Sequence, residues 1–199
     1  MELSPLAREK LAKIGELSSE ERQKLRSSEE LTSLLADYFT DKLSADGLWL
    51  KLKRFKEDGR DSMIRETQLR LVSAMSLGSS NADFERCRSG ILGCEMLKEQ
   101  NNYAELEHSL SLLENLRQQY QQEKELAFNS IKGEIQKQVE TAARQIARQA
   151  GNRGVSIDVQ GSVEASVRSS PQWRDFLVKH EKIFGQKFDD CLAKIKKLI

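Results

Sequence analysis

The chain of 199 residues is 38 % hydrophobic, 32 % charged and only 6 % aromatic. Globular domains average about 45–50 % apolar and about 25 % charged residues, so this composition favours long solvated helices over a β-sandwich or barrel. The formal net charge of +1 excludes a strong overall field for nucleic acid or anionic lipid. No stretch approaches 18 consecutive apolar residues, and the first residues contain no apolar signal-peptide core. With three cysteines, Cys87, Cys94 and Cys191, we expect a protein of the reducing cytoplasm.

The fold predicted from these features is all-α, and residues 1–100 are expected to form a region of several short helices. Pro5 suits the first position of a helix that Gly15 ends. Two later serines are each followed, three residues on, by a glutamate. This is the spacing of a capping box, in which each side chain accepts a hydrogen bond from a backbone N–H at a helix start. A new helix is therefore expected at Ser18–Glu21 and at Ser27–Glu30.

Helical spacing continues through the rest of this region. Residues 28–43 and 61–76 carry apolar side chains on one helical face. Residues 48–52 alternate like a strand, but Phe55 continues a helical spacing, so a helix is favoured there. After a cap at Ser80, the next helix contains Gly90 and Gly93, each of which costs up to about 1 kcal/mol relative to alanine. Such glycines are expected where another backbone approaches closely.

Residues 101–150 are predicted to form one long amphipathic helix. Its first half follows a heptad, and from Phe128 the spacings are 3, 4, 4, 3, 4 and 4. An eleven-residue repeat of this kind favours straight or slightly right-handed helix pairing. A continuous helix over residues 103–150 would be roughly 72 Å long, and Gly133 is the position where it could bend or split.

Charges divide this helix into an acidic and a basic half. Residues 80–125 carry five Lys and Arg against nine Asp and Glu, whereas residues 131–154 carry five against two. Exposed ion pairs contribute only about 0–1 kcal/mol each, so charge would choose orientation and the apolar stripe would supply affinity. We therefore expect antiparallel packing, either between copies or against an acidic helix of the same chain.

Residues 151–170 are predicted to form a small β-hairpin or a Gly/Ser linker. In the hairpin, a loop at residues 160–162 places three pairs on one face, namely Val159/Val163, Ile157/Ala165 and Val155/Val167. A lone two-stranded ribbon is marginal in water, so the hairpin should pack on the long helix or join other copies. Ser170 and Pro171 then begin a closing helix over residues 171–199.

Candidate chemistry is sparse. Glu105 and His108 have the Glu-x-x-His spacing of di-iron bundles, but such sites need two of these motifs, and the other histidine, His180, lies on an apolar stripe. The spacing of Cys87 and Cys94 suits buried core residues better than zinc. No phosphate-binding glycine motif, nucleophile elbow or His-Glu-x-x-His is present in the sequence. We expect no enzyme, no metal, no cofactor and no small-molecule substrate.

The sequence therefore predicts a structural or assembly protein that self-associates or docks other helical proteins. This class includes scaffolds, adaptors and components of large particles such as phage virions. One alternative is a peripheral membrane protein that uses residues 128–150, whose apolar stripe has basic flanks. A nucleic-acid binder using residues 49–56 ranks below both. The predicted interface residues are Leu106, Leu110, Leu113, Phe128, Ile131, Ile135, Val139, Ile146, Ile157, Trp173, Phe184 and Phe188.

Overall fold

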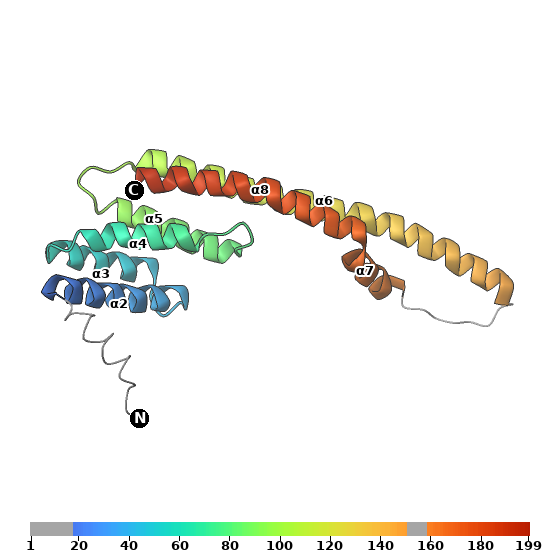
Figure 1. The fold of residues 1–199 in the computed structure, drawn as a ribbon, viewed down its shortest axis with the longest axis horizontal. Coiled ribbons are helices and arrows are strands. Elements are labelled where there is room, and N and C mark those ends of the chain that lie inside the picture. The colour runs from blue at the N-terminus through green and yellow to red at the C-terminus, as the bar shows by residue number, and fades with distance from the viewer. Residues whose placement is uncertain (1–17, 151–158) are drawn as a thin grey trace, which may run out of the picture. The chain divides into compact units, whose positions relative to one another are not determined.

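Figure 1 shows a computed structural model of the chain, which describes residues 18–150 and 159–199 and is helical throughout these ranges apart from connecting turns. The all-α prediction is confirmed. The chain divides into an N-terminal unit, which contains α2–α5, and a C-terminal unit, which contains α6–α8. The helices are α2 (Ser19–Phe39), α3 (Ala45–Glu57), α4 (Ser62–Ala74), α5 (Asn81–Glu95), α6 (Tyr103–Ala150), α7 (Val159–Ser169) and α8 (Pro171–Leu198).

The first described helix, α2, starts with the predicted capping box. The Ser18 hydroxyl accepts a hydrogen bond from the Glu21 amide at 3.2 Å, and the Glu21 carboxylate accepts one from the Ser18 amide at 2.8 Å. The second predicted start, at Ser27–Glu30, is wrong, because α2 continues through it to Phe39. Residues 19–39 contain no Gly or Pro, so nothing interrupts the backbone hydrogen bonds there. The helix expected from Pro5 lies outside the described residues.

The predicted helices α3, α4 and α5 are confirmed. Ser44 and Ser80 accept hydrogen bonds from backbone amides at the starts of α3 and α5, respectively. Gly59 follows α3 with a φ of 72°, a left-handed conformation that favours glycine and ends the helix. The ambiguous residues 48–52 are helical, because Leu48, Leu52 and Phe55 share one buried face.

Close packing in the N-terminal unit explains Gly90. A Cβ at this position in α5 would lie 2.7 Å from Leu71 Cδ1 and 3.4 Å from Tyr38 Cε1. Side chains from α4 and α2, rather than another backbone, therefore make the close approach that we predicted. A Cβ at Gly93 would make only an ordinary contact, 3.7 Å from Trp49 Cδ1.

In the C-terminal unit, α6 is continuous through Gly133 and α8 runs antiparallel along it (Figure 1). The direction follows from two ring pairs, since Tyr120 contacts His180 and Phe128 contacts Trp173. For packing within one chain, we expected an acidic helix beside the basic half of α6. The structure shows a different neighbour. Instead α8, with seven Lys and Arg against four Asp and Glu in residues 171–199, contacts α6 at Tyr120 and Glu123, in its acidic half.

The predicted β-hairpin is wrong for the residues that the structure describes, because residues 159–169 form α7. Val163 and Val167 are buried, while Ala165 between them is exposed. The buried residues are four apart, which is the spacing of one helical face, and not two apart as on one face of a strand. Both valines pack with Trp173 in one apolar cluster. Phe128, Ile131, Ile135 and Val139 of α6 pack against this cluster, so contacts distant in sequence favour the helix. Val155 and Ile157 lie outside the described residues.

Candidate functional site

A column of aromatic rings follows one face of α8. Trp173 stacks on Phe176 with ring centroids 5.5 Å apart, and Phe176 stacks on His180 at 4.7 Å. Phe184 lies 4.4 Å from His180 in a tilted arrangement. Spacings of three and four residues place these side chains on successive turns of one helical face. The column gives α8 a rigid apolar surface for a neighbouring helix.

Two rings of α6 complete the column. Phe128 meets Trp173 edge to face at 5.2 Å, and Tyr120 stacks on His180 at 5.0 Å. Aromatic pairs of this geometry contribute about 0.5–1.5 kcal/mol beyond the burial of their area. Lys124 lies over Tyr120, which is a cation–π contact. The ring contacts fix the register of α8 on α6.

His180 has polar partners on both edges of its ring. Its Nε2 lies 3.2 Å from the Tyr120 carbonyl oxygen, and its Nδ1 lies 3.5 Å from a carboxylate oxygen of Glu123. A carbonyl oxygen only accepts hydrogen bonds, so Nε2 carries a proton in this arrangement. His180 is thus a buried packing residue with a hydrogen-bond partner, as its place on the apolar stripe indicated.

The second half of α6 meets α7 and the start of α8. Val163, Val167 and Trp173 form a buried cluster against which an α6 stripe packs. Lys132 reinforces this contact through an ion pair of 2.6 Å with Glu164, which lowers the pKa of that carboxyl. The stripe residues Phe128, Ile131, Ile135 and Val139 remain only partly buried.

The predicted interface residues fall into three groups. Those already buried within the described chain offer no surface to a partner. The partly buried stripe of α6 retains some exposed apolar surface. The buried residues are Leu106, Leu110, Leu113, Trp173, Phe184 and Phe188, the partly buried ones are Phe128, Ile131, Ile135 and Val139, and the side chains of Ile146 and Ile157 lie outside the described residues.

Exposed leucines of α6 were missed by the sequence analysis. Leu112 is 50 % exposed and Leu126 is 70 % exposed. They are fourteen residues apart, or two heptads, on the side of α6 opposite the buried stripe. In the sequence, these two leucines belong to a second, weaker heptad. Its positions differ from those of the main apolar stripe in both halves of α6.

Metal binding and thiol chemistry find no support among the described residues. Glu105 and His108 are both exposed, and no group of three or more potential ligands is arranged for a metal in the described part of the chain. Burial raises the pKa of Cys87 to about 11 and that of Cys94 to about 12. Both thiols therefore stay protonated near neutral pH, which is the unreactive form.

A buried carboxylate joins α4 to α5 in the N-terminal unit. Glu95 is fully buried and accepts hydrogen bonds from Gln68 Nε2, Lys98 Nζ and the Asn102 amide, each at 2.8 Å. Burial alone would raise the pKa of Glu95, but these hydrogen bonds outweigh it and hold the pKa below its ordinary value. These three donors satisfy the charge of Glu95 and join α4 to α5, whereas Gln68 Oε1 is buried without a hydrogen-bond partner among the described residues.

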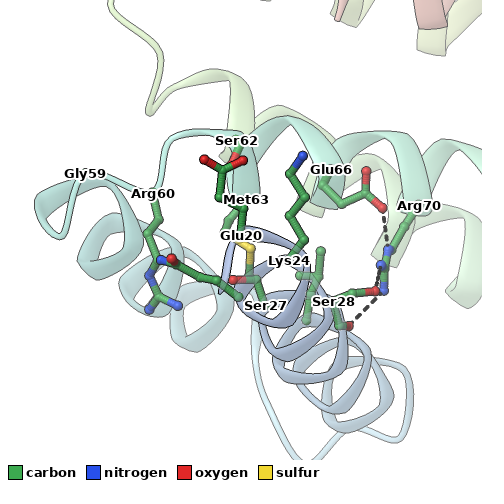
Figure 2. A pocket seen from close by; sticks show the side chains of 12 residues that line it. Glu20, Lys24, Ser27, Ser28, Gly59, Arg60, Ser62, Met63, Glu66 and Arg70 are labelled. Carbon is green, nitrogen blue, oxygen red and sulfur yellow. Dashed lines mark hydrogen bonds and ion pairs between the residues drawn. The ribbon is translucent and has the colours of Figure 1, made fainter. Parts of the chain in front are cut away.

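The groove between α2 and α4 is the next candidate (Figure 2). It has a volume of 560 Å³ and contains two guanidinium groups. Arg70 contacts Glu66 and Ser28, both at 2.8 Å, and Arg60 contacts Glu30 at 2.7 Å. Both cations are thus engaged by groups of the chain itself, and the groove shows no convergent set of groups for a ligand.

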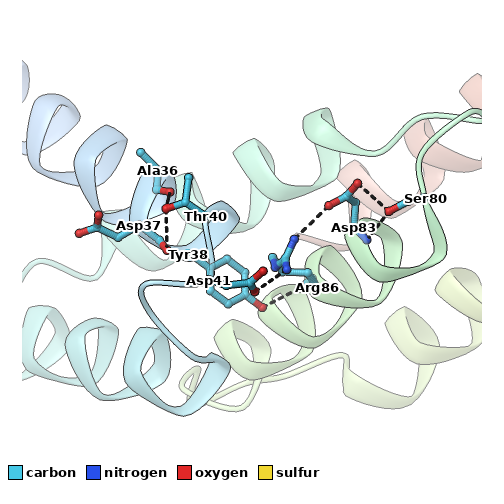
Figure 3. Close-up of polar contacts among 8 residues, drawn as sticks. All are labelled: Ala36, Asp37, Tyr38, Thr40, Asp41, Ser80, Asp83 and Arg86. Atoms are coloured by element: carbon cyan, nitrogen blue, oxygen red, sulfur yellow. Dashed lines mark hydrogen bonds and ion pairs between the residues drawn. The ribbon is translucent and has the colours of Figure 1, made fainter.

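Polar contacts around Arg86 tie α5 to the end of α2 (Figure 3). The guanidinium contacts Asp41 at 2.5 Å and Asp83 at 3.0 Å, while the Tyr38 hydroxyl donates to the Arg86 carbonyl at 2.7 Å. Asp41 has a φ of 59°, a left-handed conformation that is strained for most residues other than glycine. The Arg86 ion pair stabilises this turn.

The basic residues of α3 are partly engaged within the chain. Lys53 lies over the Trp49 ring at 5.5 Å, and Lys56 donates to the Leu97 carbonyl at 2.7 Å. Trp49 itself is half-buried. These contacts describe a helix packed into its own unit, and they reduce the surface that residues 49–56 offer to a nucleic acid.

The comparisons with known proteins identify the family. Residues 49–199 match the model of a family of unknown function, DUF6657. The chain belongs to this family. The match begins within α3 and includes α4 to α8, so it covers helices of both units. The chain matches no curated protein and no solved structure. None of the described helices combines the length and apolar character needed to cross a bilayer.

Proposed function

We propose that this DUF6657 member is a non-enzymatic structural or assembly protein that self-associates through α6. The observation that carries the proposal is the surface of that helix. Even with α7 and α8 packed against it, α6 keeps a half-buried apolar stripe and two exposed leucines, Leu112 and Leu126. Exposed apolar side chains aligned along one long helix are typical of helix-pairing proteins.

The described polar clusters agree with a role of this kind. The charged side chains of Glu95, Arg70 and Arg86 each contact other groups of the chain. Catalysis uses titratable groups that converge on an open site with room for a reacting atom. The clusters here join helices to one another instead.

Peripheral membrane binding is the alternative function. Its apolar stripe begins at Phe128, Ile131 and Ile135, and these residues already pack against the cluster of Val163, Val167 and Trp173. The stripe offers a bilayer less surface than its sequence suggested. A membrane role would require α7 and α8 to move away from α6.

Two measurements test the proposal. Size-exclusion chromatography with light scattering, over a hundredfold range of concentration, should show a mass that rises from one copy to a defined oligomer. Flotation with liposomes of neutral and anionic lipid should leave the protein unbound. A mass of one copy at every concentration, together with flotation, would replace the assembly role by membrane binding.

A further inference from the structure

We infer that α6 pairs antiparallel with α6 of a second copy through its outward face. This inference rests on the proposed function and specifies its partner, surface and register. The face is the outward stripe, which we define as the nine positions from His108 to Gln136 separated alternately by four and three residues. This is the spacing of the contact positions in a coiled coil.

The outward stripe contains no Asp, Glu, Lys or Arg, although such residues make up 32 % of the chain. Solvated helix faces usually carry charges, whereas the centre of an interface is depleted of them. Leu112 and Leu126 are its large apolar residues, and uncharged amides such as Gln119 and Gln122 lie between them. The composition is that of a modest helix-pairing seam.

Gly133 lies on the same stripe and has no packing role in the described chain. Nothing lies within 4 Å of the place where its Cβ would be, yet a glycine inside a helix costs about 1 kcal/mol relative to alanine. Mid-helix glycines allow a neighbouring helix to approach closely, as Gly90 shows in α5, where Leu71 fills the space. Gly133 would serve the second copy in the same way.

Charges beside the stripe indicate a second copy in the antiparallel direction. When Leu126 of one copy faces Asn129 of the other, Glu125 of each copy lies opposite Lys132 of the other, so this pair of opposite charges forms twice. A parallel pair in register would instead set Lys132 against Lys137 of the second copy. Lys132 already contacts Glu164, but an ammonium has three donors and can serve both carboxylates.

The two outward stripes form a small contact. In this register they face each other over residues 119–136, a length of about 27 Å at 1.5 Å per residue. A contact about 10 Å wide over this length buries on the order of 500 Å² in total, which is the size of a weak, transient interface. Because only two large apolar side chains per copy lie on the described stripe, we expect a dissociation constant on the order of micromolar.

Matched variants test the surface. Leu126→Glu places a charge at the centre of the seam and should raise the dissociation constant at least tenfold by light scattering. Val178→Glu is the control, because Val178 is 69 % exposed on α8 and lies off the stripe. Gly133→Leu and Gly185→Leu form a second pair, since both glycines have open space around them and only Gly133 lies on the stripe. Unchanged association of both Leu126→Glu and Gly133→Leu would overturn the inference.

Disulfide crosslinking tests the direction and the register. In a Cys191→Ser background, Gln119→Cys and Gln136→Cys should crosslink to each other when the two proteins are mixed. Each variant alone should stay uncrosslinked, because identical positions would then be about 25 Å apart along the helices. Self-crosslinks of each variant alone would show parallel pairing and overturn the inference.

The outcomes separate this inference from the proposed function. An oligomer that neither variant on the stripe weakens leaves self-association intact but places it on another surface. A wild-type chain that stays a single copy at every concentration overturns both.

Discussion

The two units of this protein hold their helices together by different means. In the N-terminal unit, α4 and α5 are joined by a buried carboxylate with three hydrogen-bond donors, and Gly90 allows Leu71 and Tyr38 to approach α5 closely. In the C-terminal unit, α6 and α8 are joined mainly by stacked rings and aliphatic side chains. The first arrangement is specific but sensitive to small changes. The second leaves open space around two glycines inside its helices, Gly133 and Gly185.

The comparison can be measured because each unit contains one tryptophan, Trp49 or Trp173. Variants with Trp173→Phe or Trp49→Phe would report on one unit each by fluorescence during denaturant unfolding.

Phe188→Ala should have the largest effect. Phe188 is buried on α8, and removing a buried phenyl ring typically costs about 3–5 kcal/mol. The fluorescence of Trp173 during denaturant unfolding should report this loss of stability. Ile183→Ala on the same helix is the control, since Ile183 is 54 % exposed and its truncation should cost well under 1 kcal/mol. If Phe188→Ala left the unfolding midpoint unchanged, the α6–α8 contact would not stabilise the unit.

Glu95→Gln tests the buried carboxylate and its pH dependence. Hydrogen bonds to a charged group contribute about 1.5–3 kcal/mol, so the variant should lose about that free energy of unfolding at neutral pH, as reported by Trp49. The pKa of Glu95 is lowered in the folded protein, so its contribution is present above the ordinary value of 4.5 and lost as pH falls through the folded value. The difference between the two proteins should therefore shrink below about pH 4.5. If the difference in free energy of unfolding persisted at acidic pH, the loss in Glu95→Gln would come from altered packing and not from the removed charge.

Two glycine substitutions should have opposite signs. Gly90→Ala places a Cβ 2.7 Å from Leu71 Cδ1, and overpacking of this kind costs about 1–3 kcal/mol. The helix preference of alanine offsets up to about 1 kcal/mol of this cost, so we expect a net loss of up to about 2 kcal/mol. Gly185→Ala meets open space in α8 and should stabilise the fold by up to about 1 kcal/mol, because alanine favours the helix. Chemical denaturation of both variants measures the two free energies. If both substitutions changed the free energy of unfolding in the same direction, the proposed difference in packing between the units would be contradicted.

Tyr38→Phe should have the smallest effect. It removes the hydrogen bond to the Arg86 carbonyl and leaves the ring in place, at a cost of about 0.5–1.5 kcal/mol. Denaturant unfolding followed by Trp49 fluorescence measures this loss of free energy of unfolding. Phe39→Leu is the matched control, because the adjacent Phe39 is only half-buried. An unchanged free energy of unfolding in Tyr38→Phe would show that the hydroxyl contributes little.

The sequence predicted the elements whose signals are local. Serines at the starts of α2, α5 and α8 were recognised because capping needs only a serine and the amides that follow it. The same reasoning failed at Ser27, because a capping spacing also occurs by chance inside a helix that nothing interrupts. The alternation around Val163 was ambiguous, and its contact with Trp173 decided between strand and helix.

Polar clusters were beyond the reach of sequence reasoning. Glu95 looked like one acidic residue among many, and only the meeting of α4 with α5 brings Gln68 to it. Leu126 was overlooked for another reason, since the stronger apolar stripe of α6 dominated the helical pattern. Exposure, rather than spacing, revealed it.

The capping box at the start of α2 has a practical consequence. Ser18 and Glu21 satisfy each other's backbone amides, so this helix begins with groups that it supplies itself. Two of the amides at this helix start are therefore satisfied within a single turn. A sequence change ahead of Ser18 should leave this pair of hydrogen bonds in place, because both side chains belong to the turn itself.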